Sequence, residues 1–202
     1  MISIIITNFN YGKYLARCIR SCLNQKNCEV EVIVVDDCST DNSAEVLSNF
    51  SSKVKVLKTP VNSGVAVASN LGIENAKGQF VIRVDADDYV SENMCFFLRT
   101  YLVANKDAFC VSCDYWLVDD YEQFIERKYA SIDNVSCGIM YRKDLLERHG
   151  GYNPEFRHRE EEEMRKRLGD FYSVHHLNIP FYRYRMHNHN KTKTKEYTET
   201  KI

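Results

Sequence analysis

Short apolar runs and amphipathic stretches alternate along the first ninety positions of the chain. The apolar runs are rich in β-branched residues, which favours buried strands, and they cover 2–7, 31–35, 54–57 and 80–84. The stretches between them have apolar residues at helical spacing and cover 14–24, 44–50 and 65–76. This alternation, with its short connections, predicts an α/β fold with a mostly parallel central sheet flanked by helices.

The second half of the sequence is less regular, but it also predicts a mixture of helices and strands. Helical patterns cover 92–105, 143–149 and 157–168. Extended patterns cover 109–116, 135–141, 171–177 and 181–185, whereas 117–132 fits neither. The chain has 202 residues, which is enough for one sizeable core, so we expect a single domain.

The composition is that of a soluble globular protein, with 44% hydrophobic and 27% charged residues. A formal net charge of -1 gives no reason to expect a nucleic acid partner. Met1 leads directly into the first strand, so we expect a cytoplasmic protein with neither a signal peptide nor a membrane span. From Arg183 to Lys195 the chain has Lys and Arg but no acid, and this basic stretch could attach it peripherally to anionic lipid headgroups.

Eight cysteines are spread along the chain, several of them inside apolar segments. A chain with a core of this size does not need disulfides, so we expect reduced thiols. Cys110 and Cys113 have metal-ligand spacing, but residues three apart on a strand point to opposite faces. No second pair of Cys or His follows at zinc-finger spacing, so zinc or redox chemistry is a poor interpretation.

Three carboxylates, Asp85, Asp87 and Asp88, follow directly after the fourth predicted strand. Like charges that lie close together repel, so such a cluster needs water, a cation or a basic partner. Polar loops also follow the first and second strands, at 7–10 and 36–43. The carboxyl ends of parallel strands meet at one edge of a sheet, so the three loops can converge on one ligand. For the acid cluster by itself, a divalent-metal site and a solvated acidic turn are both open interpretations.

Four consecutive glutamates, 160–163, lie in the predicted helix that ends at Leu168. They suit a helix N-terminus and have basic i,i+4 partners, so a solvated face is the simplest interpretation. Met164 and Leu168, the large apolar residues of this helix, mark its inward face. Glu160 and Glu161 lie on or beside that face, and the next two glutamates point outward. An inward carboxylate fits either a general base in a cleft or the partner of a buried arginine.

His187 lies in the basic stretch near the end of the chain. An imidazole can act there as a metal ligand or a hydrogen-bond donor, and the basic residues around it would suit a diphosphate leaving group. A solvated basic tail is the simpler alternative.

Taken together, these features resemble glycosyltransferase family 2, whose members have the GT-A fold and bind nucleotide sugars. Each motif by itself is weak, and the resemblance gains its specificity from their order over most of the chain. The matching segments are 4–10, 34–43, 62–64, 70–73, 76–78, 85–89, 150–161 and 182–187.

The resemblance implies a role for each part of the chain. A catalytic domain over 1–190 would have a nucleotide-sugar-binding half over 1–89 and an acceptor-side half over 90–190, followed by a polar tail over 191–202. Glu161 would deprotonate the acceptor hydroxyl. The residues implied for the nucleotide are Thr7, Phe9, Asn10, Asp37, Asn62 and Asp85. Those implied for a Mn2+ or Mg2+ ion on the diphosphate are Asp85, Asp87, Asp88 and His187, with Asp87 favoured.

The chain departs from the family pattern at several positions. The usual Glu-Asp pair is Glu160-Glu161 here, so Glu160 is a rival for the role of base. Ser69 stands where the family often has arginine, and Cys38 where it has glycine. The Gln-x-x-Arg-Trp signature of processive synthases is absent, which favours transfer of one sugar.

We therefore expect metal-dependent, inverting transfer of a single hexosyl or hexosaminyl unit from a nucleotide-diphosphate sugar, most simply a UDP-sugar. The acceptor would be a saccharide or a lipid-linked saccharide in polysaccharide biosynthesis. A catalytically degenerate nucleotide-sugar-binding module is one alternative. A phosphatase or phosphotransferase, with Asp85 as nucleophile and Asp87 as acid, is another.

Overall fold

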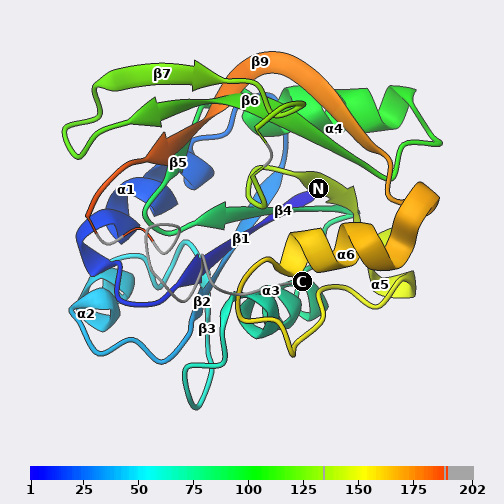
Figure 1. Cartoon of the computed structure of the whole chain (residues 1–202). Helices are drawn as coiled ribbons and strands as arrows, with labels where there is room; N and C mark the ends of the chain where they lie inside the picture. The colour runs from blue at the N-terminus through cyan, green and yellow to red at the C-terminus, as the bar shows by residue number, and fades with distance from the viewer. Residues whose placement is uncertain (134, 189, 191–202) are drawn as a thin grey trace.

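The structure is a computed structural model, and it describes residues 1–133, 135–188 and 190 (Figure 1). The predicted tail over 191–202 lies outside the described residues. Among the helices that are described, none combines the length and the apolar character needed to cross a bilayer.

The N-terminal half confirms the predicted alternation of strands and helices. Strands β1, β2, β3 and β4 pair in parallel in the order β3-β2-β1-β4, with a helix between each strand and the next along the chain. The strands are β1 (Ile2–Asn8), β2 (Val30–Asp36), β3 (Lys55–Lys58) and β4 (Phe80–Asp85). The helices are α1 (Gly12–Leu23), α2 (Ser43–Ser48) and α3 (Val65–Glu74).

The C-terminal half extends the same sheet with strands of both directions. Strand β8 (Met140–Arg142) is antiparallel to both β4 and β6 (Cys110–Val118), and β6 is parallel to β9 (Val174–Arg185). The sheet is therefore mixed. The other elements of this half are β5 (Tyr89–Val90), α4 (Met94–Ala104), β7 (Phe124–Lys128), α5 (Lys143–Arg148), α6 (Glu160–Leu168) and the 3-10 turn Gly169–Phe171.

Three predicted boundaries in this half are wrong. The strand expected over 135–141 reduces to β8, because Gly138 has a φ of +71° and ends the extended backbone next to the Tyr182 ring. Helix α6 begins at Glu160 rather than at 157, since Arg159 is left-handed with a φ of +57°. The two extended segments expected over 171–177 and 181–185 are one strand, β9, with register shifts against β6.

Two hydrophobic clusters cover the two faces of the sheet. One contains apolar residues of α1, α2 and α4, and the other contains apolar residues of α3, α5 and α6. Strand β1 contributes to both, with Ile4 and Ile6 in the first cluster and Ile5 in the second. Cys110 and Cys113 also divide between the clusters, which confirms that they point to opposite faces.

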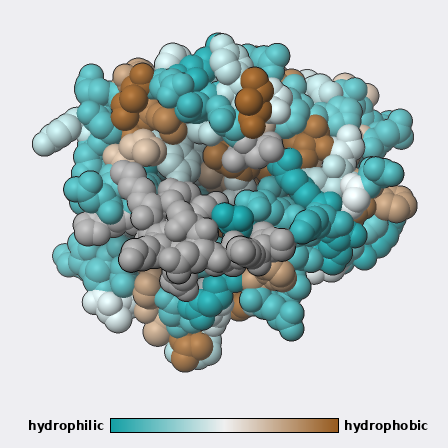
Figure 2. Space-filling view, in the orientation of Figure 1, coloured by the Kyte–Doolittle hydropathy of each residue, from teal (hydrophilic) through white to brown (hydrophobic). Residues whose placement is uncertain are grey.

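Apolar side chains are also exposed at the outer edge of the sheet, over β7. Figure 2 shows hydrophobic surface near the top of the view, where β7 lies in Figure 1. Phe124 and Ile125 of this strand are 60% and 57% exposed. In the same view, polar surface lies over α6. All residues of this helix except Met164 and Leu168 are charged.

The parallel register brings the polar strand ends together. Thr7 of β1 lies opposite Val35 of β2 on one side and opposite Asp85 of β4 on the other. The hydroxyl of Thr7 reaches the Asp85 carboxylate at 3.5 Å. The predicted convergence of the first, second and fourth strand ends at one edge of the sheet is therefore confirmed.

Candidate active site

A cavity of about 360 Å³ opens where β1, β2 and β4 end. Its wall combines the strand ends with the residues around the start of α6, so segments far apart in the sequence share it. Of the residues singled out from the sequence, it is lined by Thr7, Phe9, Asp37, Asp85, Asp87, Asp88, Glu160 and Glu161. The other three, Asn10, Asn62 and His187, are not among the described residues that line the cavity.

Asp88 is the most deeply buried of the three clustered acids. It is 2% exposed, and its carboxylate accepts hydrogen bonds from the Tyr182 hydroxyl at 2.7 Å and from the Arg185 backbone N–H at 2.8 Å. Burial raises the pKa of Asp88 well above its usual value, and the charges of Asp87 and Asp85 raise it further. Negative charge on all three acids together is thus unfavourable in this site, and a cation would offset it.

His187 lies next to the middle acid of the cluster. Its Nε2 is 2.9 Å from Asp87 Oδ2, and its ring stacks on Tyr14 with centroids 4.9 Å apart. Its backbone N–H donates to the Asn190 side chain, and Asn190 itself lines the cavity. The structure therefore brings His187 to the acid cluster through Asp87.

The donor set around Asp85 and Asp88 fits a hard divalent cation. One ligand atom each from Asp85, Asp88 and Cys137 lie within 4.8 Å of one another. Mn2+ and Mg2+ prefer oxygen ligands, which the two carboxylates supply. Burial raises the pKa of the Cys137 thiol well above its usual value, so the thiol is a weak ligand. The fit rests on the carboxylates.

Arg83 connects the acid cluster to helix α6. This residue of β4 is 4% exposed, and its Nε lies 3.1 Å from Asp85 Oδ1. Its Nη1 donates to Glu160 Oε1 at 2.5 Å, and its Nη2 donates to Ser136 Oγ at 2.9 Å. Burial by itself would lower the pKa of the guanidinium, but Asp85 and Glu160 raise it well above its usual value. Arg83 is therefore charged in this site.

Glu161, the next residue of α6, is also buried beside the cavity. Its Oε1 accepts hydrogen bonds from Arg165 and from the Tyr172 hydroxyl, the latter at 3.0 Å. Burial raises the pKa of Glu161, although Arg165 and Tyr172 act in the opposite direction. A carboxyl group with a raised pKa in a cleft has the properties of a general base.

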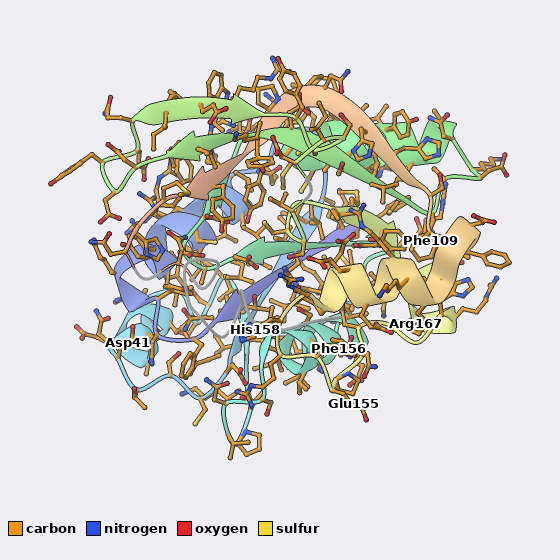
Figure 3. The ribbon with its side chains drawn as sticks, in the orientation of Figure 1. Asp41, Phe109, Glu155, Phe156, His158 and Arg167 are labelled. Atoms are coloured by element: carbon orange, nitrogen blue, oxygen red, sulfur yellow. The ribbon has the colours of Figure 1, made fainter. Side chains whose placement is uncertain are left out.

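One of the two glutamates predicted to point outward does not. Glu162 is exposed, as expected, but Glu163 is only 8% exposed. It accepts a hydrogen bond from Arg167 Nε at 2.7 Å, and Arg167 also donates to the carbonyls of His149 and Gly151. Figure 3 shows Arg167 below α6, where the loop before the helix folds back. Arg167 thus links Glu163 to this loop.

Asp37 follows β2 at the wall of the cavity and is held by the loop that precedes α3. Its carboxylate accepts hydrogen bonds from the Thr59 hydroxyl at 2.6 Å and from the backbone N–H groups of Ser63 and Gly64 at 2.9 and 2.8 Å. These bonds fix the shape of the loop beneath the cavity.

The two predicted asparagines contact other loops. The Asn10 side chain accepts from the Thr40 backbone N–H at 2.8 Å, and Asn62 Oδ1 accepts from Arg157 Nη2 at 2.7 Å. Arg157 is followed by His158 and Arg159, which line the cavity, and Figure 3 shows His158 near the centre of the view. Asn62 thus anchors a loop that carries cavity residues.

Several cavity residues have no counterpart among those predicted from the sequence. They include Tyr11, Arg83, Tyr115, Ser136, Cys137, His158, Arg159 and Tyr184. Arg83 could have been found, because a charged residue inside an apolar strand, two positions before Asp85, needs a buried partner. Tyr115 and Tyr184 could not, since their strands contain many apolar positions of the same kind.

Comparisons with known proteins find similar sequences among sugar-transferring enzymes. GlyG, a glycosyltransferase of Streptococcus pneumoniae, is 41% identical over 123 residues, which are 59% of this chain and 40% of GlyG. The poly(ribitol-phosphate) beta-N-acetylglucosaminyltransferase TarS of Staphylococcus aureus is 36% identical over 95 residues, 45% of this chain and 17% of TarS. The chain thus spans less than half the length of these curated relatives.

Solved structures show the same fold. A crystal structure of S. aureus TarS in complex with UDP-GlcNAc superposes with a TM-score of 0.79 at 19% identity, covering 100% of this chain and 61% of that one. A Pyrobaculum calidifontis mannosyltransferase in complex with GDP-Man and Mn2+ gives 0.74 at 16% identity, covering 94% and 58%. The fold is therefore the GT-A fold.

The sequence profile of one family covers most of the chain. Residues 3–170 match the family described as glycosyl transferase family 2, a span that includes all but the first residue of β1, the acid cluster and α6. The resemblance seen in the sequence motifs is confirmed by this match. This chain belongs to glycosyltransferase family 2.

Proposed function

We propose that this chain transfers a single sugar from a nucleotide-diphosphate sugar to a saccharide or lipid-linked acceptor in polysaccharide biosynthesis, with inversion at the anomeric carbon. One observation carries the proposal. The acid cluster at the end of β4 and the two glutamates that begin α6 line the same cavity. A cation-binding group for the leaving diphosphate and a base for the acceptor are the two functions that this transfer requires.

The donor side of the proposal rests on Asp85, Asp87 and Asp88. A Mn2+ or Mg2+ ion, when bound, would offset the negative charge that develops on the departing diphosphate. Asp85 and Asp88 would hold it with their carboxylate oxygens, and Asp87 would act together with His187, which lies 2.9 Å away. Thr7, Phe9 and Asp37 would line the nucleotide end of the cavity.

The acceptor side of the proposal rests on Glu161. Its carboxylate would take the proton from the acceptor hydroxyl as the oxygen attacks the anomeric carbon. Attack from the face opposite the leaving diphosphate inverts the configuration at that carbon. Glu160, on the same helix turn, is the rival base and is committed to Arg83.

UDP is the nucleotide that we propose, because two TarS structures, one with UDP and one with UDP-GlcNAc, share the fold. The relatives' names support a hexosyl or hexosaminyl unit and a cell-surface polysaccharide as acceptor. We also propose that the chain works at the cytoplasmic face of the membrane. Its predicted lipid-contacting basic stretch extends beyond the described residues.

The test is a transfer assay with UDP-GlcNAc and other UDP-hexoses in the presence of Mn2+, using saccharide acceptors of graded length. Glu161→Gln should keep UDP binding and lower the transfer rate by about 10²–10⁴-fold. Glu147→Gln is the matched control, since Glu147 also forms an i,i+4 ion pair, with Lys143, but on α5.

Two outcomes would contradict the proposal. Tight UDP-sugar binding with no transfer to any acceptor would indicate a binding module. Release of inorganic phosphate from simple phosphate esters, dependent on Asp85, would indicate a phosphatase.

A further inference from the structure

Arg83 is an unusual residue for its position in the sheet. It lies in β4, whose pattern is otherwise apolar up to Asp85, and it is 4% exposed. A guanidinium in such a place is unfavourable unless acidic or hydrogen-bonding groups compensate its charge. The partners that Arg83 does have therefore indicate its role.

Those partners belong to three separate parts of the site. Asp85, on the same face of β4, lies 3.1 Å from Nε. Ser136, in the loop before β8, accepts from Nη2 at 2.9 Å. Glu160, the first residue of α6, accepts from Nη1 at 2.5 Å. One planar guanidinium group thus joins the acid cluster, a cavity loop and the helix that carries Glu161.

The Arg83–Glu160 contact lies at the start of α6. No side-chain hydrogen bond caps the helix, and the residue before it, Arg159, is left-handed with a φ of +57°. Glu160 is 3% exposed and its ion pair with Arg83 connects the first turn to the sheet. The Arg83–Glu160 pair therefore ties the turn that carries Glu161 to the strand that carries Asp85, while Tyr172 holds the Glu161 carboxylate itself.

We propose that Arg83 and Glu160 form a positioning pair that holds Glu161 at the correct distance from the donor diphosphate, and that Glu160 is not the base. This inference rests on the proposed function. In this role Arg83 and Glu160 act through Glu161 and Asp85, and they contact neither the transferred sugar nor the acceptor hydroxyl. A displacement of about 1 Å between reacting groups can lower a rate on the order of 100-fold.

The experiment compares Glu160→Gln, Glu161→Gln, Arg83→Lys and the double variant Arg83→Met/Glu160→Gln. Glu160→Gln keeps an oxygen that accepts from Arg83, so it should lower kcat less than about tenfold, against at least about 100-fold for Glu161→Gln. Arg83→Lys keeps the charge but cannot reach three partners at once, so it should lower kcat on the order of 100-fold.

The double variant separates positioning from simple charge compensation. It removes both charges of the Arg83–Glu160 pair, and the acid that it leaves without its partner, Asp85, has a side chain that is 30% exposed, so the variant should fold, which thermal unfolding and circular dichroism will check. UDP binding with Mn2+, measured by calorimetry, should stay within about threefold of the unmodified chain, while kcat falls on the order of 100-fold.

Three results would overturn the inference. The first is a kcat of the double variant equal to that of the unmodified chain, which would mean that Arg83 and Glu160 only neutralise each other's charge. The second is a loss of UDP binding in parallel with kcat, which would mean that Arg83 acts on Asp85 alone. The third is a Glu160→Gln variant as inactive as Glu161→Gln. Each of these leaves the proposed function intact, whereas an unmodified chain that transfers no sugar would remove the proposed function itself.

Discussion

His187 Nε2 lies 2.9 Å from Asp87 Oδ2, across 100 positions of the chain. This contact attaches the segment after β9 to the loop after β4, and the Tyr14 ring stacked on His187 adds helix α1 to the same assembly. Asp87 is therefore held by a protein side chain, while Asp85 and Asp88 form the close donor cluster with Cys137. The three acids have different surroundings, so their replacements should have different effects.

Asp87→Ala should lower Mn2+-dependent UDP binding by at least about tenfold, because it removes one carboxylate from the cluster and the partner of His187. Calorimetry of UDP binding with and without Mn2+ measures the effect. Asp107→Asn is the control, since Asp107 is an exposed acid away from the cavity. Unchanged Mn2+ dependence in Asp87→Ala would exclude Asp87 from the metal site and leave Asp85 and Asp88 as its ligands.

The transfer rate should fall as the pH is lowered, with a midpoint above 4.5, the ordinary pKa of a glutamate. Burial disfavours the charged form of Glu161 and raises its pKa, and only the deprotonated carboxylate can accept a proton from the acceptor. Activity is therefore present above the raised pKa and lost below it. A profile of kcat against pH measures this limb.

Tyr172→Phe should move that acidic limb to higher pH. The Tyr172 hydroxyl donates to Glu161 Oε1 at 3.0 Å and stabilises the charged carboxylate, so its removal raises the pKa of Glu161 further. Tyr121→Phe is the control, because Tyr121 is 84% exposed. An identical limb in Tyr172→Phe would argue that a group other than Glu161 titrates.

Asp37→Ala should lower the free energy of unfolding by about 3 kcal/mol, because it leaves two backbone N–H groups and the Thr59 hydroxyl without their charged acceptor. Urea unfolding followed by circular dichroism gives the value. Glu45→Ala, at an exposed acid of α2, should change stability by less than about 0.5 kcal/mol. A loss that small in Asp37→Ala would mean that water replaces the carboxylate.

Gly72→Ala should destabilise the fold by about 1–3 kcal/mol through overpacking. A Cβ at Gly72 of α3 would lie 2.4 Å from Ile5 Cγ2 and 3.3 Å from Val35 Cγ2, both on buried strands. Thermal unfolding measures the change, with Glu74→Ala on the exposed side of the same helix as control. Equal melting temperatures for the two variants would show that α3 can move away from the sheet.

Much of the fold follows from local patterns in the sequence. Four buried strands, the helices between them and the convergence of three strand ends all depend on side-chain periodicity and on the geometry of parallel pairing. Two of the three boundaries that were wrong depend on single backbone conformations. Gly138 and Arg159 both have positive φ, and the hydrophobic pattern around them contains no signal of it.

The sequence by itself therefore determined the α/β class, the family resemblance and the presence of aspartates and glutamates suited to sugar transfer. Only the tertiary structure decided which of these side chains meet. Arg83 binds Glu160, Asp37 binds the loop before α3, and Glu163 is covered through Arg167. The physical reason is that periodicity gives the face on which a side chain lies, whereas its partner depends on how distant segments pack against that face.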